Sequence, residues 1–124
     1  HSFLVMGIED RLVQVLRNLV ENAQSFSPPH DTIRVDVHNI ENKVQIIVED
    51  KGPGISPESL DRIFQRFYQD RQKKEEFGNH SGLGLNICEQ IVELHNGRIW
   101  AENITKKNNQ ISGARFIVEF PSLE

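Results

Sequence analysis

The sequence predicts a two-layer α/β sandwich, in which a mixed, mostly antiparallel sheet is covered on one face by three helices. Helical and strand-like hydrophobic periods alternate along the chain in the order helix, hairpin, helix, helix, hairpin. The 124 residues, 37% hydrophobic and 26% charged, have the composition of one soluble domain. A sheet and helices that each carry an apolar face must bury these faces against one another, which gives the two layers.

The first elements are a short apolar stretch and a strongly periodic helix. Ser2–Met6 is typical of a short strand, which could equally be an edge strand or a tail. The first predicted helix covers Ile8–Phe26 and ends at Ser27-Pro28-Pro29, because proline interrupts helical hydrogen bonding. Its apolar face consists of Leu12, Leu16, Leu19, Val20 and Ala23.

A polar row runs along the same helix. Asn18, Asn22 and Ser25 recur at i, i+4 and i+7, beside the apolar face rather than opposite it. Carboxamides at the edge of a core can coordinate a cation while their stems stay packed. The alternative for two asparagines four residues apart is a solvated helix face.

A hairpin is predicted over residues 32–49. Thr32–His38 and Val44–Glu49 both alternate apolar and polar residues, and Asn39–Lys43 is a polar turn between them. The hairpin supplies two neighbouring strands of the sheet.

The segment Asp50–Ile55 follows the hairpin at once. A carboxylate at a strand end, here Asp50, can accept a hydrogen bond from a ligand's N–H donor. Gly52 and Gly54 have no Cβ, so the backbone can approach a flat ring closely, and Pro53 stiffens the turn between them. A tight surface turn is the alternative interpretation.

Two further helices are predicted. Ser56 is placed as the N-cap and Pro57 as the first residue of a helix that runs to about Phe64. The third helix covers Gly82–Leu94 and ends at Asn96-Gly97 in the left-handed manner. The residues between them, 69–81, have no apolar period and several charges, so we expect a mobile loop.

The last two strands are predicted at Arg98–Asn103 and Ala114–Phe120, with a turn region at residues 106–109. The single cysteine, Cys88, falls in a helical pattern and is expected to be a buried small hydrophobic residue in a reducing cytosol. The formal charge of −4 gives no reason to expect a nucleic-acid partner, and no apolar run approaches the length of a membrane span.

Four sequence boxes, in this order, resemble those of the ATP-binding catalytic domain of bacterial sensor histidine kinases. They are the asparagine pair, the turn after Asp50, the phenylalanine box Ile63–Tyr68 and the glycine cluster Gly82–Leu85. The resemblance covers Ile8 to Pro121 and implies the Bergerat-type ATP-binding fold of the gyrase, Hsp90, histidine kinase and MutL ATPases. The stretches Phe67–Leu85 and Gly97–Trp100 further resemble the acid- or envelope-responsive ChvG/ExoS type of sensor kinase.

The resemblance implies a site for ATP and Mg²⁺. Asp50 would accept a hydrogen bond from the exocyclic amine of adenine, and Asn22, supported by Asn18, would supply an oxygen to the metal. Phosphate would lie at the N-terminus of the helix after Gly82, and residues 69–81 would be the ATP lid. The implied nucleotide-binding residues are Asn18, Asn22, Phe26, Asp50, Gly52, Gly54, Ile55, Phe67, Tyr68, Ser81, Gly82, Leu83, Gly84 and Leu85.

Two basic residues that the family usually has near phosphate are absent here. Ser25 and Gln69 stand in their places, and lid residues such as Arg71 or Lys73 could substitute. These departures weaken the expectation of tight phosphate binding more than that of adenine binding. Gly113 resembles the family's final glycine, although such a glycine is more often simply part of a turn.

The implied function is that of a protein histidine kinase. ATP-Mg would donate its γ-phosphoryl group to a histidine on a separate helical dimerisation and phosphoacceptor domain of the same protein, for relay to a response regulator. Residues 1–124 would then be a fragment, the cytoplasmic catalytic domain of an inner-membrane sensor, that touches neither membrane nor nucleic acid. No catalytic residue is expected within it, and the chain's five histidines lack the usual acceptor context.

Two other functions stay open from the sequence. A stand-alone ATPase of the gyrase or Hsp90 kind carries a glutamate where this chain has Asn18, because a water must be activated. A binding module, either a serine-kinase anti-sigma factor or a degenerate domain that holds nucleotide without transfer, is the other alternative.

Overall fold

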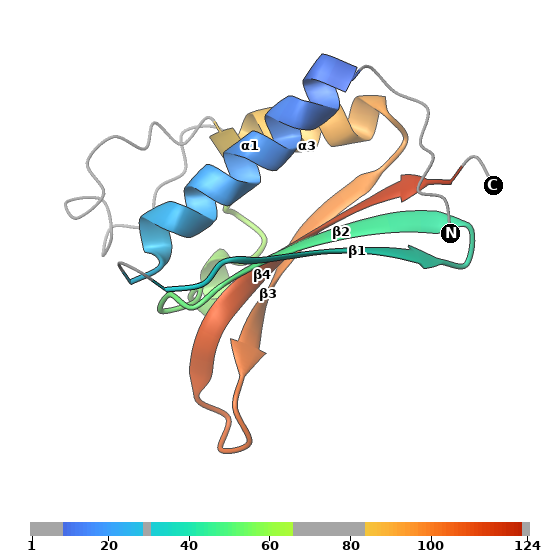
Figure 1. The fold of residues 1–124 in the computed structure, drawn as a ribbon. Helices are drawn as coiled ribbons and strands as arrows, with labels where there is room; N and C mark the ends of the chain where they lie inside the picture. The colour runs from blue at the N-terminus through green and yellow to red at the C-terminus, as the bar shows by residue number, and fades with distance from the viewer. Residues whose placement is uncertain (1–8, 29–30, 66–83, 123–124) are drawn as a thin grey trace.

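The computed structural model describes residues 9–28, 31–65 and 84–122. Two α-helices lie over one face of a four-stranded sheet in this part of the chain (Figure 1). The elements in chain order are α1 (Glu9–Phe26), β1 (Arg34–Ile40), β2 (Lys43–Asp50), the 3₁₀-helix η1 (Pro57–Ser59), α3 (Gly84–Leu94), β3 (Arg98–Thr105) and β4 (Ile111–Pro121).

The strand order is β1-β2-β4-β3, and the three pairings among the described strands are all antiparallel. The register places Asp50 of β2 opposite Ala114 of β4, and Ala114 opposite Asn103 of β3. These three residues therefore form one row across the sheet, at the C-terminal end of β2.

Residues with positive φ form two of the tight turns between elements. Ile40 pairs with Lys43, so the β1–β2 turn has two central residues, Glu41 at φ 50° and Asn42 at φ 67°. Positive φ at both positions is the type I′ geometry, which matches the twist of the two strands. Asn96, at φ 62°, ends α3 as expected, and Gly97 N–H then donates to the Val92 carbonyl at 2.9 Å.

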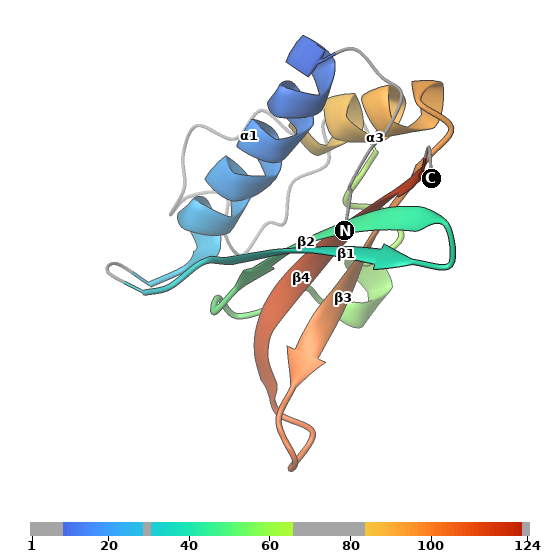
Figure 2. The same ribbon diagram turned by 45° about the vertical axis from the view of Figure 1, so that its right-hand side comes forward.

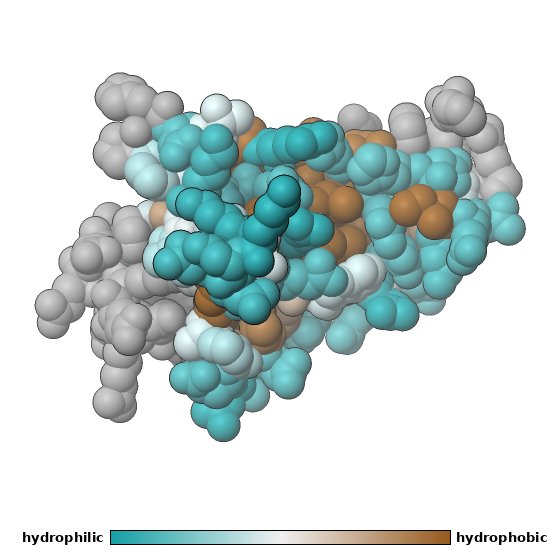
Figure 3. Space-filling view, turned by 90° about the horizontal axis from the view of Figure 1, so that it is seen from below, coloured by the Kyte–Doolittle hydropathy of each residue, from teal (hydrophilic) through white to brown (hydrophobic). Residues whose placement is uncertain are grey.

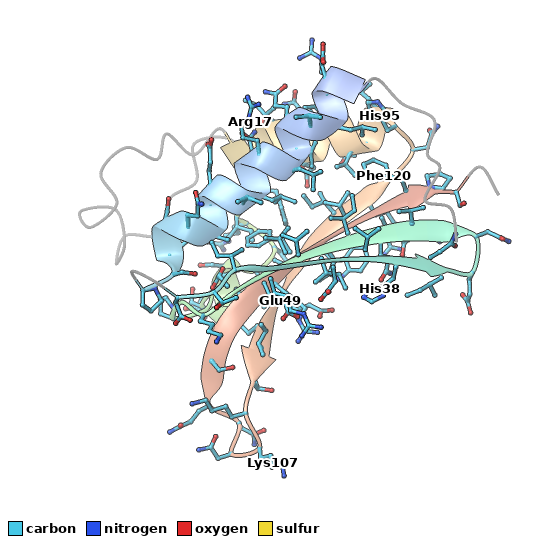
Figure 4. The ribbon with its side chains drawn as sticks, viewed as in Figure 1. Arg17, His38, Glu49, His95, Lys107 and Phe120 are labelled. Atoms are coloured by element: carbon cyan, nitrogen blue, oxygen red, sulfur yellow. The ribbon has the colours of Figure 1, made fainter. Side chains whose placement is uncertain are left out.

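The core lies between the helices and the sheet. Leu19 of α1, Val92 of α3 and Val118 of β4 are completely buried, and Phe64 meets Phe116 edge to face at 6.1 Å. Phe120 points from β4 toward the helix layer, where its ring meets His95 edge to face (Figure 4). Cys88 is also fully buried, which confirms the predicted burial of this residue.

The opposite face of the sheet is mainly hydrophilic (Figure 3). Arg115 of β4 lies between Glu49 of β2 and Glu102 of β3, at 3.5 and 3.9 Å, which alternates charge across three strands. Glu49 and His38 point to this side, away from the helices (Figure 4).

The sandwich is confirmed, but the predicted helix count is wrong for the described residues. Ser56 precedes Pro57 as expected, yet Pro57–Ser59 forms a 3₁₀-helix followed by turns, and the Ser56 hydroxyl bonds the Ser59 hydroxyl instead of a backbone N–H. Most hydrogen bonds in this segment span three residues, such as Arg62 N–H to the Ser59 carbonyl at 2.8 Å. The chain is thus wound more tightly than an α-helix while it still buries Ile63 and Phe64.

The last hairpin is longer than the apolar pattern predicts. Its strands extend to Thr105 and begin at Ile111, with a register shift between Ile104 and Thr105. This part of the hairpin projects away from the two helices in both ribbon views (Figures 1 and 2). The expected strand at Ser2–Met6 and the expected lid at residues 69–81 lie outside the described residues.

Candidate nucleotide-binding site

Asp50 is a buried carboxylate at the end of β2. Its side chain is held in place by the backbone, because Oδ1 accepts hydrogen bonds from Gly52 N–H at 2.9 Å and from Ala114 N–H at 3.3 Å. Only 3% of the residue is exposed. A buried carboxylate is costly unless it is hydrogen-bonded, so these donors stabilise an acceptor that would otherwise be unfavourable here.

Close backbone packing surrounds this carboxylate. A Cβ on Gly52 would overlap the backbone carbonyl oxygen of Phe26, and a Cβ on Gly113 would overlap that of Asp50. Glycine is therefore required at both positions, because another part of the backbone lies where a side chain would begin. The contact between Gly52 and Phe26 also brings the last turn of α1 against the segment that follows β2.

The asparagine row of α1 faces the other helix and the core edge. Asn18 Nδ2 donates to the carbonyl of Gly84, the first residue of α3, at 3.4 Å. Asn22, one turn before Phe26, is 9% exposed, and its buried Nδ2 has no hydrogen-bond partner in the described structure. A buried amide without a partner costs free energy, which is consistent with a site where a ligand supplies the missing contact.

Ser25, which stands where a basic residue was expected from the resemblance, bonds its own helix. Its hydroxyl donates to the carbonyl of Glu21, one turn earlier, at 3.0 Å. The departure noted in the sequence thus leaves a short side chain bonded to its own helix.

The N-terminus of α3 is the expected phosphate side of the site. Gly84 is exposed, and a Cβ there would meet no atom of the described residues within 4 Å. Leu85 is partly buried against the core, and Asn86 Nδ2 donates to the Phe64 carbonyl at 3.0 Å. The start of this 11-residue helix is therefore anchored to both α1 and the segment after η1, with the positive end of its dipole near Asn18.

The structure places two clusters of the predicted residues. Asp50, Gly52 and Phe26 meet where β2 and α1 end, and Asn18 meets Gly84 where α3 begins. Gly54 and Ile55 contact the β3–β4 hairpin. The predicted residues that lie outside the described part of the chain are Phe67, Tyr68, Ser81, Gly82 and Leu83.

Sequence reasoning missed two contributions from the last hairpin. Asn103 bonds the backbone of Ile55 through both ends of its carboxamide, and Ile111 packs against Gly54. The signal was present, since Asn103 is a polar residue at an inward-facing strand position, after Ile99 and Ala101. Gly113, read as more often part of a turn, is a close-packed strand residue instead.

Among the described residues, no group of three or more histidine, cysteine, aspartate and glutamate side chains could hold a metal ion. A divalent cation here would depend on carboxamide oxygens and on the ligand's own oxygens, a donor set that magnesium accepts. No described helix is both long and apolar enough to cross a membrane.

Comparison with known proteins defines the class. The family described as "Histidine kinase-, DNA gyrase B-, and HSP90-like ATPase" matches residues 7–124, and this chain belongs to that family. It is 50% identical to the sensor protein ChvG of Rhizobium meliloti over 123 residues. These residues make up 98% of this chain and 21% of that protein. It is 34% identical over 120 residues to the histidine kinase BaeS of Escherichia coli, over 97% of this chain and 25% of that protein.

Solved structures give the same result. The mycobacterial sensor histidine kinase MprB superposes with a TM-score of 0.81 at 27% identity, over 94% of this chain and 74% of that chain. Full-length ShkA in complex with AMPPNP superposes with a TM-score of 0.73 at 28% identity, over 90% of this chain and 21% of that chain. The resemblance to sensor kinases, including those of the ChvG type, is thereby confirmed. The chain spans about a fifth of the length of the ChvG proteins that it matches.

Proposed function

We propose that this chain binds ATP with Mg²⁺ and presents the γ-phosphoryl group to a histidine on a separate helical domain of the same protein. The observation that carries the proposal is the buried Asp50 carboxylate, which two backbone N–H groups hold at the end of β2. The complex of ShkA with AMPPNP supports a nucleotide as the ligand of this fold.

Asp50 would recognise adenine by accepting a hydrogen bond from its exocyclic amine. Guanine presents a carbonyl oxygen at the same position, so a carboxylate favours adenine over guanine. A hydrogen bond to a charged group contributes about 1.5–3 kcal/mol. Phe26, at the end of α1, would supply apolar contact beside the ring, since its backbone already lies against Gly52.

Asn22 would hold the metal through its carboxamide oxygen, with Asn18 supporting it. The fit rests on Asn22 itself, whose buried Nδ2 has no hydrogen-bond partner among the described residues, and a half-turn of the carboxamide would bring Oδ1 to the place of Nδ2. Magnesium, when bound, would neutralise charge on the phosphate oxygens. The first N–H groups of α3 would face the phosphates, because a helix N-terminus favours anions.

In the proposed reaction the bond between the γ-phosphorus and the β–γ bridging oxygen breaks, and a phosphorus–nitrogen bond to an imidazole forms. The protein's part is positioning and charge neutralisation. Neither described histidine suits the role of acceptor, since His38 lies on β1 and His95 follows the end of α3. We propose that the acceptor belongs to another part of a longer, membrane-anchored sensor protein, of which residues 1–124 are the cytoplasmic catalytic domain, and that a response regulator receives the phosphoryl group.

Radiolabelled ATP tests this function. The isolated chain should bind ATP, hydrolyse it very slowly and leave itself unlabelled. After the helical domain of the same protein is added, label should appear on its histidine, more slowly than in the intact protein because tethering supplies effective concentration. Fast hydrolysis by the chain alone would favour a stand-alone ATPase, and binding without transfer to a folded partner would favour a nucleotide-binding module.

A further inference from the structure

We propose that Asn103 of β3 is a positioning residue for the nucleotide site, because it clamps the far end of the segment between Asp50 and Ile55. The inference rests on the proposed function, since it concerns the same site. Asn103 is not expected to touch the ligand itself.

Two reciprocal hydrogen bonds form the clamp. Asn103 Oδ1 accepts from Ile55 N–H at 2.7 Å, and Asn103 Nδ2 donates to the Ile55 carbonyl at 2.6 Å. Both polar groups of one peptide residue are thus satisfied by a single side chain 48 positions away in sequence. The pairing also fixes the orientation of the carboxamide, because the reversed amide would oppose donor to donor and acceptor to acceptor.

The register explains why this side chain reaches the site. Asn103 shares a cross-strand row with Ala114 and Asp50, and it lies on the helix-side face together with Ile99 and Ala101. Ala114 N–H holds the carboxylate of Asp50 at the start of the segment, while Asn103 holds Ile55 at its end. The β3–β4 hairpin therefore anchors both ends.

The middle of the segment packs against the same hairpin. Gly54 has φ +83°, in the left-handed region that favours glycine, and a Cβ there would overlap Ile111 and crowd the Asn103 oxygen. These contacts leave the segment little freedom to move away from the hairpin. A segment already ordered before binding gives up less entropy when a ligand arrives.

The effect on affinity follows from which contacts survive the loss of Asn103. Gly52 and Ala114 would still hold the Asp50 carboxylate, so the adenine acceptor would remain. The Ile55 end would be released, and part of the ordering would have to occur on binding. We expect a loss of roughly tenfold in affinity, the equivalent of about 1.4 kcal/mol.

The test compares Asn103→Leu, which has nearly the same shape but no polar groups, with Ser112→Ala in the same hairpin. Ser112 Oγ donates to the Ile104 carbonyl at 3.3 Å, so its removal weakens the hairpin at a hydrogen bond that does not involve the Asp50–Ile55 segment. Binding of ADP to the 124-residue chain is measured by calorimetry. The midpoint of thermal unfolding gives the stability of each variant, and NMR gives the hydrogen exchange rate of the Ile55 amide. Should Asn103→Leu fail to fold, Asn103→Ser, whose hydroxyl is too short to bridge both Ile55 groups, replaces it.

The proposal is supported if Asn103→Leu binds ADP roughly tenfold more weakly and its Ile55 amide exchanges faster, while Ser112→Ala binds as the wild type does. It is overturned if Asn103→Leu keeps wild-type affinity, or if both variants lose affinity in proportion to their loss of stability. If the wild type itself does not bind ADP, the proposed function fails first, and the inference fails with it.

Discussion

Gly113 and Asp50 are packed so closely that any side chain on Gly113 would overlap the backbone carbonyl oxygen of Asp50. Gly113 lies in β4, next to the residue that pairs with Asp50 in the sheet. The position of the buried carboxylate thus depends on a strand residue that has no side chain.

Substitution of this glycine should destabilise the fold. Gly113→Ala should lower the free energy of unfolding by about 1–3 kcal/mol, because the added methyl group forces β2 and β4 apart. Urea unfolding followed by circular dichroism measures the change. Gly84→Ala is the matched control, since a Cβ there meets no described residue and Gly84 lies in the helix α3, and it should be neutral or slightly stabilising. Equal stability of Gly113→Ala and the wild type would contradict the packing described here.

The β1–β2 turn offers a stabilising change. Glu41 occupies φ 50°, which is unfavourable for a residue with a long side chain. Glu41→Asn should raise the free energy of unfolding by roughly 0.5–1 kcal/mol, because asparagine adopts the left-handed region more readily. The same change at the exposed helical residue Glu93 should slightly destabilise the protein. A drop in stability for Glu41→Asn would show that the turn does not have this geometry.

Periodicity predicted α1, the first hairpin and α3 because each has an unambiguous apolar face. The boundaries of some elements moved by a few residues, for example from Thr32–His38 to Arg34–Ile40 for the first strand. The α-helix predicted at residues 56–64 was wrong for a physical reason. Buried Ser59, Ile63 and Phe64 repeat at a helical spacing, but the backbone bonds mainly three residues apart, and an apolar period does not distinguish these two windings.

Burial determines the ionisation of Cys88. Desolvation raises the pKa of its thiol to about 11, although a hydrogen bond with Asn18 acts in the opposite direction. The folded state therefore favours the protonated thiol. This contribution is complete below the usual thiol pKa of about 8.5 and is lost as pH rises toward 11.

The difference in unfolding free energy between the wild type and Cys88→Ala should therefore shrink by roughly 2–3 kcal/mol between pH 8 and pH 11. Urea titrations of both proteins at four or five pH values measure it. The alanine variant shares the other titrating groups, so their effects cancel in the difference. A difference that stays constant across this range would mean that the thiol is not desolvated in the folded protein.

The candidate site was predictable where a motif is local and unpredictable where it depends on long-range contacts. Asp50, Gly52 and Gly54 are adjacent in sequence, and the asparagine row repeats along one helix, so both could be singled out. Asn103 acts on Ile55 across 48 positions, which only the register of β3 and β4 reveals. Gly52 was predicted to let the backbone approach a ligand ring, and what the structure shows is the close approach of the Phe26 backbone.

Asn22→Ala should abolish the magnesium dependence of nucleotide binding. Its stability should change little, because Nδ2 of the amide has no hydrogen-bond partner among the described residues and alanine has the higher helix propensity. Calorimetry with ADP in magnesium and in EDTA measures the dependence, and Gln24→Ala, at an exposed position of the same helix, is the control. If Asn22→Ala responds to magnesium as the wild type does, Asn22 does not hold the metal.

The most direct test of the account is the binding of ADP to Asp50→Asn, measured by calorimetry. Asparagine keeps the shape and an oxygen for Gly52 and Ala114, but it removes the charge and turns a donor toward the adenine amine. Affinity should fall by about 1.5–3 kcal/mol. Asp36→Asn, which removes an equal charge beside Arg34 on the outer face, should bind as the wild type does. Wild-type affinity in a folded Asp50→Asn variant would contradict the assignment of this carboxylate to adenine.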